Sequence, residues 1–148
     1  MYEHTVGVPL ILRGPGIPKG VRRSAQCYLR DLYPTVCELV GIEIPKSVQG
    51  RSLLSVIRGQ AASPDSEVFG YFTDVQRMIR TDRWKLICYP QIGRRQLFDL
   101  TADPQEQHDL SDSAPHVAVR DGLCAKLAAW QDEVNDPAPR ATTHGRAK

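Results

Sequence analysis

A cluster of basic side chains is the part of the sequence best suited to bind an anion. It places six positive charges between residues 77 and 95, on Arg77, Arg80, Arg83, Lys85, Arg94 and Arg95. A guanidinium group binds a sulfate or a carboxylate through two parallel hydrogen bonds. Some of these side chains, with Arg77 and Arg94 as our candidates, could therefore hold a polyanionic sugar. The alternative is a solvated strand face with ordinary ion pairs to Asp82, Asp99 and Asp103.

Other residue types that often carry chemistry are present, but their spacing predicts no metal site. Asp103, Glu106, His108 and Asp109 fall within the segment DPQEQHDL. This spacing matches neither a calcium loop nor a zinc site, so we expect a surface turn there. The four cysteines are far apart and include no CxxC pair. We expect small buried thiols, and one disulfide of unknown pairing is also compatible with the sequence.

Short alternating segments are predicted to position the basic residues on an antiparallel sheet. The pattern indicates strands near residues 76–81, 84–89 and 96–100. Side chains alternate between the two faces of a strand, so Lys85 should lie on the face opposite Trp84. A helix from about residue 116 to 134 follows. Its apolar stripe predicts that it covers the sheet; the stripe contains Leu123, Leu127, Trp130 and Val134.

The N-terminal half has a different pattern. The apolar run at residues 6–12 is typical of a strand buried on both faces of a parallel sheet, which needs neighbouring strands. A short strand is expected at 21–28. Helices are expected at 32–40, with Asp31 as N-cap and Gly41 as the stop, and at 53–58. The buried face of the first helix is predicted to contain Leu32, Val36, Leu39 and Val40.

The totals argue against several classes of protein, and nucleic-acid binding through the same arginines is the weakest of the alternatives. The 148 residues carry a net charge of +2, which gives no support for a nucleic-acid partner, and no aromatic RNA-binding motif or helix-turn-helix pattern is present. No apolar run approaches the ~20 residues needed to cross a membrane. No basic and apolar leader follows Met1.

Four segments, in this order, resemble the type I sulfatases of the alkaline phosphatase superfamily. MYEHTVGVPLILRGPGIPKG is similar to the segment that follows the family's sulfate-binding lysine. DLYPTVCELVGIEIP and GRSLLSVIRG match linking elements. RTDRWKLI, followed by LFDLTADPQEQHDL, is similar to the C-terminal subdomain of an arylsulfatase-like protein. The resemblance covers roughly residues 1–115.

This resemblance implies an α/β fold class and a division of the chain. Residues 1–62 would be one strand and the helices at the C-terminal edge of the catalytic α/β domain. Residues 63–134 would be the C-terminal subdomain, a small antiparallel sheet covered by a helix, and residues 135–148 a disordered tail.

The resemblance also implies a formylglycine nucleophile, made from a cysteine or serine in a CxPSR-type motif, and a Ca²⁺ ion. Neither that motif nor a matching set of Asp and Asn ligands occurs in the sequence. We therefore predict no catalytic residue here and no sulfatase activity for this chain alone. Met1 is expected to be an internal methionine of a longer reading frame.

Tyr2, Glu3 and His4 are the residues that the resemblance places nearest to the sulfate site, just after the family's sulfate-binding lysine. A histidine changes charge near neutral pH, so His4 could act as an acid or contact the sulfate. Glu3 would orient a neighbouring cation or backbone group. With Tyr2, they join Arg77 and Arg94 as predicted substrate-binding residues.

The resulting hypothesis is a C-terminal part of a sulfatase that contributes scaffold and recognition surface for a sulfated small molecule or glycan. The parent protein would be periplasmic or secreted if it carries a signal peptide. Two alternatives are a non-catalytic module that binds sulfated glycans and a fragment of a related phosphatase or phosphonate hydrolase. The sequence predicts no oligomeric state.

Overall fold

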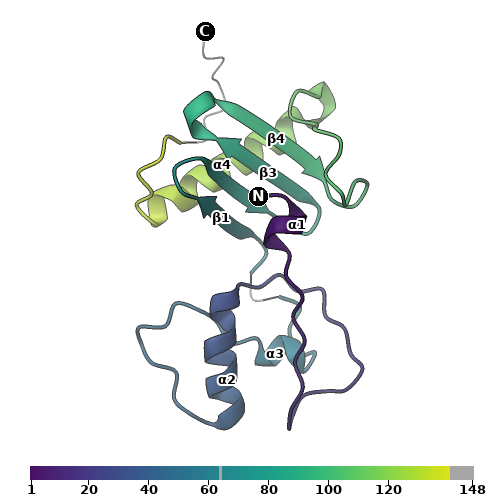
Figure 1. Cartoon of the computed structure of the whole chain (residues 1–148), viewed down its shortest axis with the longest axis vertical. Helices are drawn as coiled ribbons and strands as arrows, with labels where there is room; N and C mark the ends of the chain where they lie inside the picture. The colour runs from purple at the N-terminus through teal and green to yellow at the C-terminus, as the bar shows by residue number, and fades with distance from the viewer. Residues whose placement is uncertain (64, 141–148) are drawn as a thin grey trace. The chain divides into compact units, whose positions relative to one another are not determined.

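The computed structural model describes residues 1–63 and 65–140 (Figure 1). They form two compact units, one built from Met1–Val8 with the chain from Phe69 onward, and one built from Pro9–Val68. We call these the sheet unit and the helical unit. Within the described residues, no helix has both the length and the apolar character that a membrane span requires.

The sheet unit contains a four-stranded sheet in sequence order. Its strands are β1 (Val68–Phe72), β2 (Gln76–Arg80), β3 (Trp84–Tyr89) and β4 (Arg94–Asp99). The last three are antiparallel, and Lys85 is paired with Arg80 on one side and Phe98 on the other. The bounds of β3 are those that the sequence predicts, because strict alternation is a local signal.

Two apolar clusters cover the two faces of this sheet. On one face, buried residues of β2, β3 and β4 pack against Leu123, Cys124 and Leu127 of α4 (Val117–Glu133). On the other face, Met78, Ile87, Phe98 and Leu100 pack against Met1, Tyr2 and Val6. These last residues flank and include α1 (Glu3–Val6), which lies across the sheet opposite α4 (Figure 1). The predicted sheet with a covering C-terminal helix is confirmed.

The chain after α4 is ordered as far as it is described, in contrast to the tail predicted to be disordered from residue 135. Asp136 accepts hydrogen bonds from Arg77 on β2 and from Gln131 on α4. Arg140 donates to Asp132 and to two backbone carbonyls of this segment. These contacts hold residues 135–140 on the α4 side of the sheet, and residues 141–148 of the predicted tail lie outside the described part of the chain.

All four cysteines are free thiols, with Cys27 half-buried and the other three buried. Cys88 on β3 and Cys124 on α4 interact across the core. The hydrogen bond to Cys124 and burial both raise the pKa of Cys88. The hydrogen bond from Cys88, helped by Arg95, lowers the pKa of Cys124 to about 7 although burial opposes this.

The helical unit contains a short 3₁₀ turn, η1 (Leu29–Asp31), and the helices α2 (Leu32–Val40) and α3 (Leu54–Ile57). The predicted end of α2 at Gly41 is confirmed, since Gly41 adopts φ 74° and allows the chain to leave the helix. Asp31 does not cap α2 through its side chain. Its carboxylate instead accepts the backbone N–H groups of Tyr28 and Arg51, which ties the loop before α3 to the start of α2.

Thr35 makes the matching link inside the helical unit. Its buried hydroxyl donates to the carbonyl of Asp31 at 2.6 Å and accepts the N–H of Leu53 at 2.8 Å. We predict that Thr35→Val destabilises this unit by about 1–3 kcal/mol, because the N–H of Leu53 is left buried without a partner. Hydrogen exchange of the Leu53 amide measures the effect. Thr35→Ser, which keeps the hydroxyl, should retain the protection, and equal loss in both variants would contradict the assignment.

Three N-terminal predictions are wrong. The strand predicted at residues 6–12 is absent: Val6 belongs to α1, residues 7–12 form no strand, and Val8, Leu10 and Ile11 are 55%, 41% and 89% exposed. A parallel strand needs a partner for its backbone groups, and the described residues offer none to this segment. Residues 21–28 also form no strand.

The predicted buried face of α2 is the third. The residues of α2 that are buried are Pro34, Thr35 and Cys37, whereas Val36 and Val40 are more than half exposed. Helical spacing identifies an apolar stripe, but it does not say whether the chain itself covers that stripe.

Candidate functional site

The first candidate site is built by α1, which brings Tyr2, Glu3 and His4 together on one face of the sheet. The helical turn forms because the N–H groups of Thr5 and Val6 both donate to the carbonyl of Tyr2. It is anchored by the packing of Tyr2 and Val6 against the apolar cluster of the sheet. The structure therefore fixes these residues through the sheet unit rather than through a neighbouring parallel strand.

Four charged groups clamp α1 to the sheet. Glu3 Oε1 lies 2.6 Å from Nζ of Lys85 and 3.0 Å from Nε of Arg80. Lys85 also lies 2.8 Å from Oε1 of Glu106, and Oε2 of Glu106 accepts the backbone N–H of Glu3 at 2.6 Å. We call Glu3, Arg80, Lys85 and Glu106 the α1 clamp. Its two positive and two negative charges balance, which is what burial of charge requires.

Burial differs strongly across the α1 clamp. The side chains of Lys85 and Glu106 are 0% and 1% exposed, and that of Glu3 is 30% exposed. Burial by itself would raise the pKa of Glu3, but the interactions with Lys85 and then Arg80 outweigh it and lower this pKa. Glu3 is therefore an anion held by two cations.

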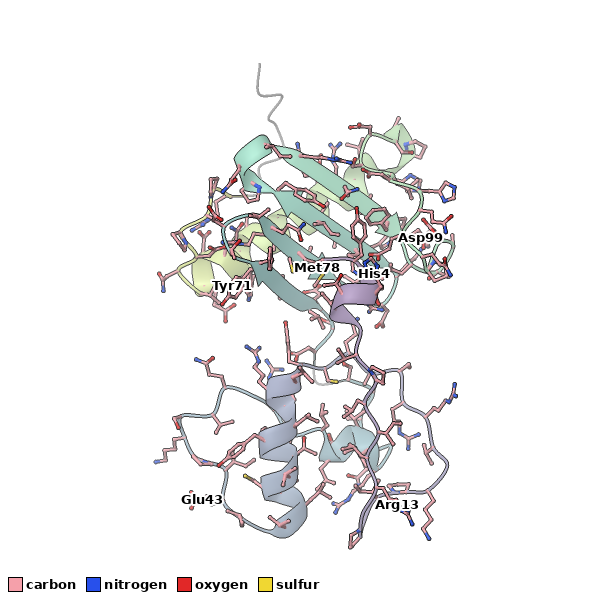
Figure 2. All side chains as sticks on the ribbon, in the orientation of Figure 1. His4, Arg13, Glu43, Tyr71, Met78 and Asp99 are labelled. Atoms are coloured by element: carbon pink, nitrogen blue, oxygen red, sulfur yellow. The ribbon has the colours of Figure 1, made fainter. Side chains whose placement is uncertain are left out.

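The aromatic ring of Tyr2 positions His4. The two rings stack with centroids 5.7 Å apart and an angle of 10° between their planes. The Tyr2 hydroxyl donates to Oε1 of Gln96 at 3.0 Å, and the Tyr89 hydroxyl donates to the same oxygen at 2.8 Å. Tyr2 is thus locked in place, and His4 is the exposed member of the three (Figure 2). An exposed imidazole fixed by a rigid neighbour is available to contact an anion or transfer a proton.

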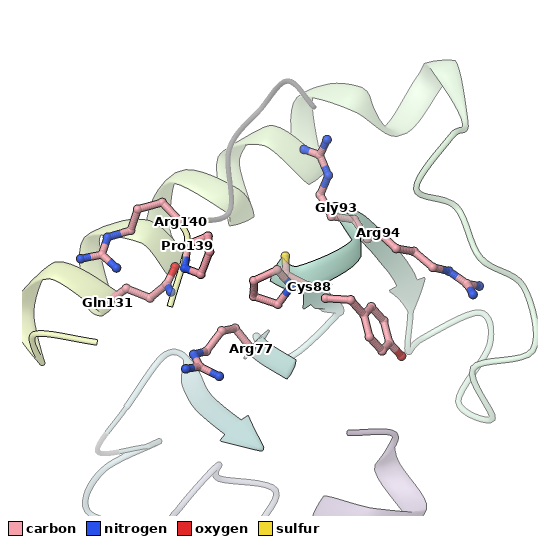
Figure 3. A pocket seen from close by; sticks show the side chains of 10 residues that line it. Arg77, Cys88, Gly93, Arg94, Gln131, Pro139 and Arg140 are labelled. Atoms are coloured by element: carbon pink, nitrogen blue, oxygen red, sulfur yellow. The ribbon is translucent and has the colours of Figure 1, made fainter. Parts of the chain in front are cut away.

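The structure does not bring Arg77 to this site, whereas Arg94 lies on the α1 face of the sheet, two positions before Gln96. Arg77 lies on the α4 face, where Nε and Nη2 donate to the two carboxylate oxygens of Asp136 at 2.5 and 2.8 Å. Arg94 begins β4 and is exposed. Both side chains line a pocket beside the turn between β3 and β4 (Figure 3).

Arg83 and Asp99 form one of the predicted ordinary ion pairs, with Nη2 and Oδ2 2.7 Å apart. Sequence reasoning missed Glu106 and Gln96 as partners of the α1 residues, and Asp136 as the partner of Arg77. Glu106 was placed in a surface turn, yet it is buried and adopts φ 56°. A buried cation such as Lys85 requires a counter-ion, and that requirement is the signal that could have directed a search for Glu106.

Calcium, which the resemblance implies, finds no suitable set of ligands here. Among residues 1–63 and 65–140, no group of three or more His, Cys, Asp or Glu side chains could hold a metal ion. The carboxylates of the α1 clamp are already paired with Lys85 and Arg80. We therefore assign no step of any reaction to a metal bound by these residues.

A four-stranded sheet covered by one helix, with an N-terminal segment clamped to its other face, is a fold that comparisons with protein families and solved structures match to sulfatases. Comparison with known protein families matches residues 1–133 to "N-sulphoglucosamine sulphohydrolase, C-terminal". The chain belongs to this family.

Individual relatives agree with this assignment. Arylsulfatase K of Mus musculus is 32% identical over 97% of this chain and 28% of its own length. The solved structure of the 2-O GAG sulfatase BT1596 is 25% identical with a TM-score of 0.68, over 83% of this chain and 29% of its own. That of BT4656, in complex with its substrate D-glucosamine-2-N,6-O-disulfate, is 26% identical with a TM-score of 0.61, over 74% and 24%. The chain thus spans less than a third of each relative.

Proposed function

We propose that this chain is the C-terminal part of a protein that hydrolyses sulfate esters of a sugar, and that it supplies scaffold and substrate contacts rather than the nucleophile. The family assignment and the sulfated sugar bound by one structural relative support this class of substrate. The α1 clamp is the observation that carries the proposal. It ties α1, which would follow the family's sulfate-binding lysine, to the C-terminal sheet. The sheet would thereby fix the position of α1 beside the sulfate site of the catalytic domain.

Exposed apolar side chains in the helical unit support the same proposal. Ile11 is 89% exposed, and Val36 and Val40 on α2 are 54% and 61% exposed. A group of exposed apolar residues on a soluble domain commonly marks a surface that another part of a protein covers. We infer that the remainder of a catalytic α/β domain, to which residues 1–62 would belong, covers these side chains.

Within this proposal, His4 is the residue placed to contact the sulfate group or to protonate the leaving oxygen, with Tyr2 positioning its ring. Glu3 acts indirectly, by holding α1 against Lys85 and Arg80. The nucleophile and the calcium ligands would come from sequence outside this chain, and the isolated chain is expected to be inactive.

Activity of a protein that carries this chain together with a sulfatase catalytic domain tests this function. We predict that His4→Ala lowers kcat/KM on a sulfated monosaccharide by about 10²-fold or more, the range for loss of a positioned acid or base. His108→Ala, which changes another exposed histidine, is the matched control and should leave the rate unchanged. Hydrolysis of a phosphate or phosphonate ester in preference to the sulfate ester would instead favour the related hydrolases, and unchanged activity of His4→Ala would remove His4 from the site.

A further inference from the structure

A pair of buried thiols joins the sheet to α4. Cys88 on β3 and Cys124 on α4 are 3% and 0% exposed and belong to the same apolar cluster. The S–H group of Cys88 donates a hydrogen bond to the sulfur of Cys124. Neither residue takes part in the function proposed for the α1 face. Two thiol side chains that already contact each other can be joined by a disulfide with little movement of the backbone.

The guanidinium group of Arg95 places a positive charge beside this pair. Arg95 on β4 is paired with Cys88 in the sheet register, so both side chains point to the α4 face. Its Nη1 lies 3.8 Å from Sγ of Cys124. The hydrogen bond from Cys88 and then Arg95 lower the pKa of Cys124, although burial and Asp121 oppose this. Because the thiolate is the reactive form of cysteine, the structure holds a nucleophilic sulfur next to a second thiol.

A cavity gives small molecules a route to the two thiols. It encloses about 220 Å³ beside the turn between β3 and β4, and both Cys88 and Arg95 line it (Figure 3). Because Arg95 also contacts Cys124, the cavity reaches to within one side chain of both sulfurs. An oxidant the size of hydrogen peroxide fits this space, since a single water molecule occupies about 30 Å³. The cavity therefore admits the smallest oxidants and disfavours larger thiol reagents.

We propose that Cys88 and Cys124 form a peroxide-sensitive dithiol, which closes to a disulfide between β3 and α4. The thiolate of Cys124 attacks one oxygen of hydrogen peroxide, the O–O bond breaks, and the hydroxide that leaves takes up a proton to become water. Cys124 is then a sulfenic acid. The sulfur of Cys88 displaces its hydroxyl group, which leaves as water with the proton of Cys88. Two thiols thus lose two electrons and two protons, and one hydrogen peroxide becomes two water molecules.

The disulfide is expected to stabilise the sheet unit. It joins two residues that are far apart in the sequence, and such a link restricts the unfolded chain. The melting temperature of the oxidised chain should therefore exceed that of the reduced chain by about 10 °C or more. A dithiol reductant should reverse this change, because it returns both sulfurs to thiols.

Treatment of the folded 148-residue chain with hydrogen peroxide tests the proposal. Thiol counting in denaturant should show that two of the four thiols are lost. Mass spectrometry of unreduced peptides should show one cross-link, between Cys88 and Cys124, and dithiothreitol should restore both thiols. A cross-link that contains Cys27 or Cys37, oxidation of Cys124 without a cross-link, or no loss of thiols would overturn the proposal. A cross-link that lowers the melting temperature would also overturn it, because the two sulfurs would then not meet in the native fold.

Cysteine variants separate this pair from the other thiols. Cys27→Ala combined with Cys37→Ala removes both thiols of the helical unit, and this variant should cross-link as the unchanged chain does. Cys88→Ala should abolish the cross-link, with circular dichroism as the check that the sheet unit still folds. Cross-linking that disappears in the first variant and persists in the second would refute the assignment.

An arginine variant keeps both thiols in place and tests the reactive form. Arg95→Met should slow cross-linking at pH 6 about tenfold, because loss of the neighbouring charge lowers the population of thiolate. Arg94→Met changes the exposed neighbour on the opposite face of the sheet and should not slow it. Equal rates in these two variants would refute activation of Cys124 by Arg95. Because these assays use the chain alone and no ester, their failure would leave the hydrolysis test of His4 unaffected.

Discussion

Methionine in place of Lys85 is expected to lower the free energy of unfolding of the sheet unit by about 3–5 kcal/mol, the cost of breaking a buried ion pair by removing one partner. The Lys85 side chain is 0% exposed and lies between the carboxylates of Glu3 and Glu106, at 2.6 and 2.8 Å. Methionine fills similar space but leaves Glu106, itself 1% exposed, without its cation. Much of the loss therefore comes from the carboxylate that remains.

Urea denaturation followed by tryptophan fluorescence measures this loss in the sheet unit alone. The two tryptophans of the chain, Trp84 and Trp130, both belong to that unit. Lys126→Met changes an exposed lysine of α4 and should alter stability by no more than about 1 kcal/mol, the most that an exposed ion pair commonly contributes. A similar small effect of Lys85→Met would show that the α1 clamp contributes little.

A second substitution separates lost attraction from the remaining buried charge. Adding Glu106→Gln to Lys85→Met should recover part of the stability, since a neutral amide can still accept the N–H of Glu3 and is cheaper to bury than a carboxylate. A double variant less stable than Lys85→Met alone would mean that Glu106 stabilises the fold mainly through contacts other than Lys85.

The part of the fold that the sequence predicted well is the part specified by local signals. The alternation around Trp84 and Lys85 gave the bounds of β3 and the correct face for each side chain. Gly41 marked the end of α2, because a left-handed backbone conformation favours glycine. Both signals are contained in a few consecutive residues, so the prediction does not depend on which distant residues pack against them.

The wrong predictions depend on residues far away in the sequence or outside the chain. The apolar run that includes Val8 and Ile11 has the composition of a buried strand, but the described chain contains no strand to pair with it. Val36 and Val40 on α2 form an apolar stripe that remains exposed because no described part of the chain packs against it. An apolar composition indicates that a segment is suited to burial. It does not say whether the residues that bury it belong to the same chain segment or to another part of a larger protein.

The candidate sites show a related difficulty with charges. The basic cluster was visible in the sequence, but its pairing was not, because several carboxylates are available to each cation. Arg77 is paired with Asp136, 59 positions later, in a segment predicted to be disordered. Lys85 is paired with Glu106, which was read as part of a surface turn. The order of strands and the side of the sheet decide such pairs, and only the assembled fold specifies both.

Arg77→Met is the second substitution with a large expected effect, again about 3–5 kcal/mol at neutral pH. The side chains of Arg77 and Asp136 are 5% and 8% exposed, and two hydrogen bonds join them. Arg77 also donates to the carbonyls of Thr73 and Gln76. Its loss should leave Asp136 as a buried carboxylate with Gln131 and the N–H of Ala138 as its remaining donors.

The pH dependence distinguishes this pair from simple packing. The hydrogen bonds from Arg77 lower the pKa of Asp136 well below its ordinary value of 3.8, although burial opposes the shift. A depressed folded-state pKa contributes stability that is present above the ordinary value and is lost as the pH falls through the folded one. The difference between the unchanged protein and Arg77→Met should therefore be largest at neutral pH and should shrink once the pH falls below about 4. Tryptophan-monitored urea denaturation at pH 7 and pH 3 measures it.

Arg83→Met provides the matched control, because Arg83 is paired with Asp99 on the same sheet but is 60% exposed. An exposed pair contributes about 0–1 kcal/mol, so this variant should lose far less than Arg77→Met at pH 7. A difference between Arg77→Met and the unchanged protein that stays constant with pH would show that Arg77 acts through packing and its backbone contacts. If the loss is instead large at pH 7 and small at pH 3, the buried pair of Arg77 and Asp136 is what holds the C-terminal segment in place. Burial of the pair, rather than the number of arginines nearby, would then decide which cation of the basic cluster has this role.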